Sequence, residues 1–219
     1  MLAGLSTVLL VGVTPQSSAD ETRPAPRLTR PAADRTDPLA VYFRPDAVGR
    51  NMTRLATTTC GTERWPVKTM ADLDRSRVDL TPQDTTIRSL RRRATPTDRP
   101  QASRANGTER TTFRVRARLV DYVREADDDY HLVLADKAGR TIVAEIPDTT
   151  CVGKISPVKP AIARARNRFD GQFAATTSFK QTNVRVVVKG VGFFDFFHGQ
   201  TGMAPNDLEL HPVTGLRFR

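Results

Sequence analysis

Hydrophobic and polar residues alternate from Thr111 onward, which is the pattern of half-buried strands. In TTFRVRARLVDYV, the side chains of Arg114, Arg116 and Arg118 occupy one face and apolar side chains occupy the other. Four more segments have strand character: YHLVLAD, TIVAEIP, NVRVVVKGVGFF and DLELHPV, at residues 130–136, 141–147, 183–194 and 207–213. This part of the chain is therefore predicted to be mainly β, with five strands.

A helix is predicted between the third and fourth strands, beginning at Ser156-Pro157 or at Pro160. Its apolar stripe consists of Val158, Ile162, Ala165 and Phe169. Three strands, a helix and two strands is the element order of the OB-fold, a five-stranded, partly open barrel. We predict an OB-fold-like barrel over residues 111–219, and an open α+β sheet built from the same elements is the alternative.

The chain before this region shows little periodicity and divides into three parts. Residues 1–19 are uncharged and mostly apolar, and they end in small residues, so they resemble a signal peptide; an ordinary buried N-terminal segment is the alternative. Their apolar core is too short for a membrane span, which needs about 20 apolar residues. Residues 20–59 are rich in Pro and Arg and are expected to form a disordered tether. Residues 60–110 are expected to be irregular, with a short helix in TPQDTTIRSLRRR capped by Thr81 or Asp84.

The chain has two cysteines, Cys60 and Cys151. An exported protein meets an oxidising environment, in which an even number of cysteines favours pairing. A bridge between them would contribute about 4 kcal/mol by restricting the unfolded chain. Two separate buried thiols are the alternative. The protein is accordingly expected to be secreted or associated with the cell envelope, with no transmembrane segment in the mature chain.

The formal net charge is +10, from 34 Lys and Arg against 24 Asp and Glu. The densest basic segment is IRSLRRRATPTDRP, which contains Arg88, Arg91, Arg92 and Arg93. Such a cluster attracts nucleic acid or an anionic cell-envelope polymer by Coulomb forces that salt weakens. A solvated linker without a partner is the alternative.

Four polar side chains are expected to share one outer face of three neighbouring strands: His131, Glu145, Glu209 and His211. His198 lies in the adjoining loop, and Asp148 and Asn206 are secondary candidates. Two imidazoles and two carboxylates can bind zinc or a similar divalent ion, with a glutamate as general base. Hydrogen bonds that fix the strand register and a site for a non-metal ligand are the alternatives.

The stretch GVGFFDFFHG contains four phenylalanines, Phe193, Phe194, Phe196 and Phe197. Gly190 and Gly192 are expected to let the fourth strand bend. Most of the phenylalanines are expected in the core, and a platform on which a ligand stacks is the alternative.

Several long motifs, CGTERWPVKT, DDDYHLVLAD, TIVAEIPD and GVGFFDFFHGQTGMAPNDLELHPV, resemble those of a family of exported bacterial proteins described mainly as hypothetical. The resemblance spans most of residues 60–213. It implies an exported compartment and this architecture, and it implies no reaction.

These observations favour an exported, OB-fold-like binding protein for nucleic acid or another anionic polymer. The second hypothesis is a nuclease-like, metal-dependent hydrolase that uses the His/Glu cluster, and the third is an envelope protein-interaction module. No nucleophile elbow, phosphate-binding loop or dinucleotide fingerprint occurs in the sequence. No organic cofactor is expected, and a divalent metal is the one ion that the His/Glu cluster would suit.

Overall fold

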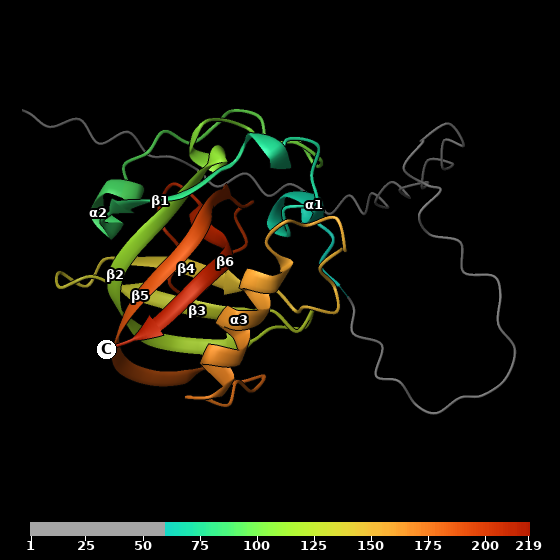
Figure 1. The fold of residues 1–219 in the computed structure, drawn as a ribbon. Helices are drawn as coiled ribbons and strands as arrows, with labels where there is room; N and C mark the ends of the chain where they lie inside the picture. Colours follow the sequence, from blue (N-terminus) through green and yellow to red (C-terminus); the bar gives the residue numbers. More distant parts are fainter. Residues whose placement is uncertain (1–59) are drawn as a thin grey trace, which may run out of the picture. The chain divides into compact units, whose positions relative to one another are not determined.

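A computed structural model describes residues 60–219. This part is mainly β (Figure 1). The strands are β1 (Asp79–Thr85), β2 (Thr111–Arg124), β3 (Tyr130–Ala135), β4 (Thr141–Ile146), β5 (Lys180–Phe194) and β6 (Leu208–Phe218). The α-helices are α1 (Trp65–Lys68), α2 (Ile87–Leu90) and α3 (Lys159–Asp170), and short 3-10 turns cover Arg75–Arg77 and Thr108–Arg110. The predicted signal peptide and tether, residues 1–19 and 20–59, lie outside the described residues.

The six strands form one sheet in the order β1-β2-β3-β4-β6-β5, and β2 also pairs with β5. That second pairing closes β2 to β6 into a ring of five strands, whereas an open sheet would leave β2 and β5 unpaired with each other. The pairings of β4 with β6 and of β1 with β2 are parallel, and the other pairings are antiparallel.

The five predicted strands and the helix between the third and the fourth are all present. The predicted stripe of α3, Val158, Ile162, Ala165 and Phe169, is buried against the ring. The final strand, β6, runs to Phe218, beyond the predicted end at Val213. The core fills the ring with the apolar faces of its strands, for example Phe113, Leu132 and Ile142.

The helix predicted in TPQDTTIRSLRRR is largely wrong. Only Ile87–Leu90 is helical, and its cap is Thr86, whose side chain accepts a hydrogen bond from the Ser89 N–H. Asp79–Thr85 is instead strand β1, which pairs with the N-terminal half of β2. This segment is polar and contains Pro82, which suits an edge strand, and tertiary pairing rather than local periodicity decides its conformation.

Residues 60–110 have little regular structure but are firmly packed. Arg64 is fully buried; it donates to both carboxylate oxygens of Glu109, at 2.6 and 2.9 Å, and to the Phe194 carbonyl at 2.7 Å. Arg104 is buried and bonds Asp72 in the same manner. The predicted Cys60–Cys151 disulfide is present and ties this region to the segment after β4. No helix in the described part of the chain is long and apolar enough to cross a membrane.

Candidate functional site

Three of the four predicted site residues are in contact. His131 and Glu145 are direct partners in the β3–β4 ladder, and His131 Nδ1 lies 3.1 Å from Glu145 Oε1. His211 Nδ1 lies 2.9 Å from the other oxygen, Glu145 Oε2. Glu209 is two residues before His211 on the same face of β6. Strand alternation thus placed these residues on one face, as predicted.

The prediction that these four side chains lie on an outer, exposed face was wrong. The exposed fractions of His131, Glu145, Glu209 and His211 are 1, 2, 2 and 0%. The loop after β5 covers this face, since the Thr201 carbonyl lies 2.9 Å from His131 Nε2. Helix α1 covers it as well, with Lys68 Nζ 3.1 Å from Asp195 Oδ2. We call this group the buried cluster: Lys68, Asp129, His131, Glu145, Asp195, Glu209 and His211.

Sequence reasoning missed Lys68, Asp129 and Asp195. The side chain of Asp129 is buried, and its Oδ2 lies 3.6 Å from His211 Nε2. The sequence feature that could have identified Asp129 is its position two residues before His131, since residues two apart in an extended segment point to the same face. Lys68 and Asp195 lie outside the strands, and no periodicity marks them.

Burial shifts the acid–base equilibria of the buried cluster. It raises the pKa of Asp129 and of Glu209 well above the usual value, and neighbouring carboxylates act in the same direction. Burial also opposes the charged form of Glu145, but the hydrogen bond to His131 and the nearby His211 outweigh it and hold the pKa of Glu145 well below normal. For His131, the bonds to Glu125 and Glu145 outweigh burial and raise its pKa to about 11.

The remaining predicted site residues lie apart from the buried cluster. His198 is half exposed and pairs with Glu63 at 2.8 Å. The Asp148 side chain accepts a bond from the Thr150 N–H, and Asn206 Nδ2 donates to the Leu90 and Arg93 carbonyls. The side chains of Asp148 and Asn206 therefore hold the backbone of neighbouring loops in place.

The predicted basic patch of Arg88, Arg91, Arg92 and Arg93 divides into two pairs. Arg91 donates to the Thr141 carbonyl, and Arg93 stacks on the ring of Phe113 at 4.7 Å from its centroid. Arg88 and Arg92 are exposed beside a hollow of about 450 Å³. Within the described part of the chain, Arg88 and Arg92 are the exposed members of the four, and Arg93 lines the same hollow.

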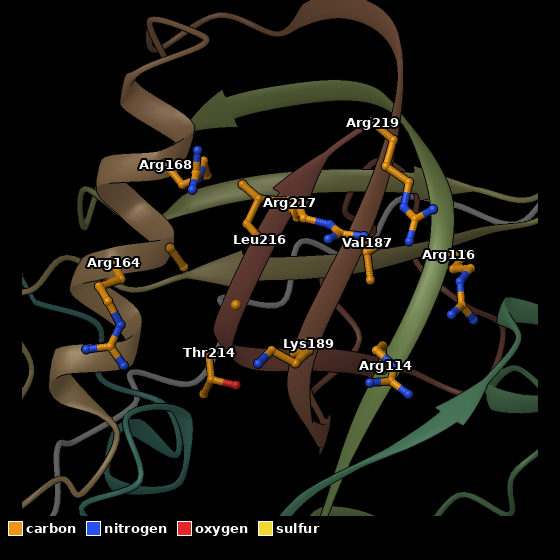
Figure 2. A pocket seen from close by; sticks show the side chains of 12 residues that line it. Arg114, Arg116, Arg164, Arg168, Val187, Lys189, Thr214, Leu216, Arg217 and Arg219 are labelled. Carbon is orange, nitrogen blue, oxygen red and sulfur yellow. The ribbon is translucent and has the colours of Figure 1, made fainter.

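A larger basic surface lies across β2, β5, β6 and α3 (Figure 2). It surrounds a cavity of about 550 Å³, which we call the basic groove. Its lining contains seven cationic side chains: Arg114, Arg116, Arg164, Arg168, Lys189, Arg217 and Arg219. Among the described residues, no carboxylate side chain lines it.

The register of the strand pairs brings the cationic side chains of the basic groove together. Arg114 pairs with Lys189, which pairs with Gly215; two residues along, Arg116 pairs with Val187, which pairs with Arg217. A third row follows with Arg118 opposite Arg185, whose carbonyl accepts the Arg219 N–H. Neighbouring strands are about 4.8 Å apart and successive rows about 6.6 Å, so these cations form a lattice on the outer face.

One carboxyl side chain, that of Asp84, borders this lattice and neutralises only its β2 edge. Asp84 on β1 pairs with Arg114, and at 3.5 Å with Arg116. The cationic side chains of β5, β6 and α3 in the groove have no ion pair among the described residues. Arginine guanidinium groups in such an array suit bidentate binding of phosphate or carboxylate.

No protein-family model matches this chain, and no curated protein and no solved structure matches it.

Proposed function

We propose that this protein binds an anionic polymer in the basic groove, with nucleic acid as the leading candidate. The observation that carries the proposal is the lattice of cations on β2, β5 and β6, extended by Arg164 and Arg168 of α3. Concentrated like charge raises the local concentration of a polyanion and releases counterions when the polymer binds. The strand order and the position of α3 support an OB-fold-like architecture for the ring.

The composition of the groove also bears on how the polymer is recognised. Its lining is arginine and lysine with short apolar and hydroxyl side chains, and Phe218 in the adjoining hollow is the one aromatic group next to it among the described residues. Stacking of bases on aromatic side chains is the usual source of base contact in single-strand binders. We therefore expect contacts to phosphate groups and little dependence on base sequence.

We propose in addition that the protein works outside the cytoplasm. The Cys60–Cys151 bridge supports this, because disulfides persist mainly in oxidising compartments. An anionic envelope polymer is then the second ligand of the same chemistry. The hydrolase reading gains no support from the geometry, because the buried cluster has no exposed face at which a polymer could react.

The test is a salt titration of binding to the full chain, by fluorescence anisotropy with single-stranded DNA, duplex DNA, RNA and a polyphosphate. For single strands, five to seven contacts predict a slope of log K against log salt of about −3.5 to −5. No affinity at low salt, or affinity indifferent to salt, would overturn the proposal. Preference for polyphosphate over every nucleic acid would assign the groove to an envelope polymer.

Paired variants locate the binding surface. Arg116→Gln with Arg217→Gln removes two charges from the groove, and Arg88→Gln with Arg92→Gln removes two exposed charges elsewhere. We expect the groove pair to weaken binding at least about 10-fold and to reduce the slope by about 1.5, with little change in the control pair. Equal losses in both pairs would attribute binding to net charge alone.

A further inference from the structure

Three side chains of the buried cluster converge on one point inside the protein. Asp129 precedes β3, Glu145 lies on β4 and His211 on β6, and one ligand atom from each lies within 4.8 Å of the other two. All three are at most 2% exposed. Glu145 and His211 lie on adjacent strands of the ring and Asp129 directly precedes the next strand, and sites built on strands hold side chains more precisely than sites on loops.

The atoms at this point lack hydrogen-bond partners. Asp129 Oδ2 and both ring nitrogens of His211 are buried without a partner among the described residues. The 2.9 Å contact between His211 Nδ1 and Glu145 Oε2 is too poorly aligned to count as a hydrogen bond. Buried polar atoms are almost always satisfied, so orphaned atoms that face one another indicate a missing ligand.

The other oxygens of the same carboxylates are held in place. Asp129 Oδ1 accepts the Asp148 N–H at 2.8 Å, and Glu145 Oε1 lies 3.1 Å from His131 Nδ1. These bonds orient the remaining oxygens, Asp129 Oδ2 and Glu145 Oε2, toward His211. Hydrogen bonds of this kind around a metal site fix the ligands and tune their basicity.

His131 is a poorer candidate ligand. Its Nδ1 contacts Glu125 and Glu145, and its Nε2 contacts the Thr201 carbonyl, so both ring nitrogens already have partners. Among residues 60–219, neither ring nitrogen of His211 has a hydrogen-bond partner. The geometry therefore favours the group with His211 over the alternative group of Glu125, His131 and Glu145.

The charge balance of the interior agrees with a divalent cation. The buried cluster contains four carboxylates, those of Asp129, Glu145, Asp195 and Glu209. Against these four carboxylates, the cluster has one amino group, that of Lys68, and two imidazoles. A divalent cation bound among them would offset part of the negative charge, and uncompensated buried charges are costly.

We propose that Asp129, Glu145 and His211 form a buried structural site for one divalent transition-metal ion of the zinc class. One imidazole and two carboxylates are a ligand set that zinc accepts, whereas magnesium and calcium prefer oxygen ligands alone. The site is buried, so its role is to hold the start of β3, the end of β4 and the start of β6 together. This metal-site proposal does not depend on the proposed polymer binding, and a separate experiment tests it.

The test uses the full chain without an affinity tag. The protein is dialysed against chelator, loaded with zinc, desalted and assayed by elemental analysis, and cobalt loading reports the ligand geometry by its visible absorption. We expect one equivalent of zinc and a melting temperature that rises by about 5–10 °C on loading. Less than a tenth of an equivalent, together with a melting temperature indifferent to zinc and chelator, would overturn the proposal.

Three variants separate this site from its surroundings. Asp129→Asn keeps the acceptor for the Asp148 N–H but removes the ligand charge, and we expect it to lose the zinc and the melting response. Glu209→Gln removes a buried carboxylate of the same cluster outside the ligand set. His198→Ala disrupts the other candidate group of Glu63, Asp195 and His198, in which Glu63 and His198 are exposed. Both are expected to retain one equivalent, and zinc retained by Asp129→Asn, or lost from His198→Ala, would refute the assignment.

Discussion

Arg116 on β2 and Arg217 on β6 both flank Val187 of β5, so two guanidinium groups lie in one cross-strand row on the outer face of the ring. Like charges close together on a sheet repel and destabilise it, and the directly opposed pair of Arg114 and Lys189 adds to this repulsion. The basic groove thus contains a destabilising arrangement that packing does not require, because these side chains lie on the solvent side of the strands. Such an arrangement is what a binding surface for an anion needs.

Removing one of these charges should stabilise the protein at low salt. For Arg217→Gln we expect the free energy of unfolding to rise by about 0.5 kcal/mol in 10 mM salt, because repulsion from the neighbouring cations is relieved. In 1 M salt the Debye length is about 3 Å and the difference should vanish. Urea denaturation at both salt concentrations measures it, with Arg88→Gln as the exposed control; a loss of stability at low salt would show that Arg217 has a structural role.

The sequence predicted the ring strands because each has one face in the core, which forces alternation of apolar and polar residues. In β2, for example, Val115 and Leu119 are buried while Arg116 is exposed. It failed for β1, since an edge strand with a proline and polar side chains carries no such pattern.

The same reasoning explains the error over the buried cluster. Alternation correctly gave His131, Glu145 and His211 one facing, but it cannot say what covers that face. The cover comes from α1, with Lys68, and from the loop with Thr201, and neither segment is periodic. The basic groove was missed for a related reason: Arg114, Lys189 and Arg217 are far apart in sequence, and only the ladder registers bring them together.

The disulfide should contribute strongly to stability. Cys60 and Cys151 are 91 residues apart, and closing a loop of that length restricts the unfolded chain by about 4–5 kcal/mol. We expect the double variant Cys60→Ser, Cys151→Ser to lose about that much free energy of unfolding in guanidinium titrations. Wild-type protein in strong reductant is the matched comparison and should lose the same amount. A change below about 1 kcal/mol in both would mean that residues 60–72 stay docked without the bridge.

Gly192 on β5 should not tolerate a side chain. A Cβ there would lie 2.5 Å from the Thr108 carbonyl oxygen and 2.9 Å from the ring of Phe113. We expect Gly192→Ala to cost about 1–3 kcal/mol of unfolding free energy, as overpacking usually does. Gly153→Ala is the control, because a Cβ there meets nothing within 4 Å. Equal stability of the two variants would show that β5 can move away from the turn at Thr108.

The ion pair of Arg64 and Glu109 should make the protein sensitive to acid. Both side chains are fully buried; burial opposes the charged form of Glu109, but its bonds from Arg64 outweigh burial and lower the pKa of Glu109 below its usual 4.5. A group whose pKa is lowered by folding stabilises the protein above its unfolded pKa, and this contribution is lost as the pH falls through the folded value. We therefore expect full stabilisation at pH 7 and a loss that sets in below about pH 4.5.

Glu109→Gln isolates this contribution because it leaves the guanidinium of Arg64 buried without its partner. We expect it to lose about 3–5 kcal/mol at pH 7, measured by chemical denaturation, and to show a weaker dependence of stability on pH between 5 and 3 than the wild type. Asp84→Asn breaks the exposed pair with Arg114 and should change stability little at either pH, since solvent screens that pair. If Glu109→Gln were as stable as Asp84→Asn at pH 7, the carbonyl groups of Pro100 and Phe194 would suffice to hold Arg64 in the interior. The packing of residues 60–110 on the ring would then depend on hydrogen bonds to the backbone, with no contribution from the ion pair.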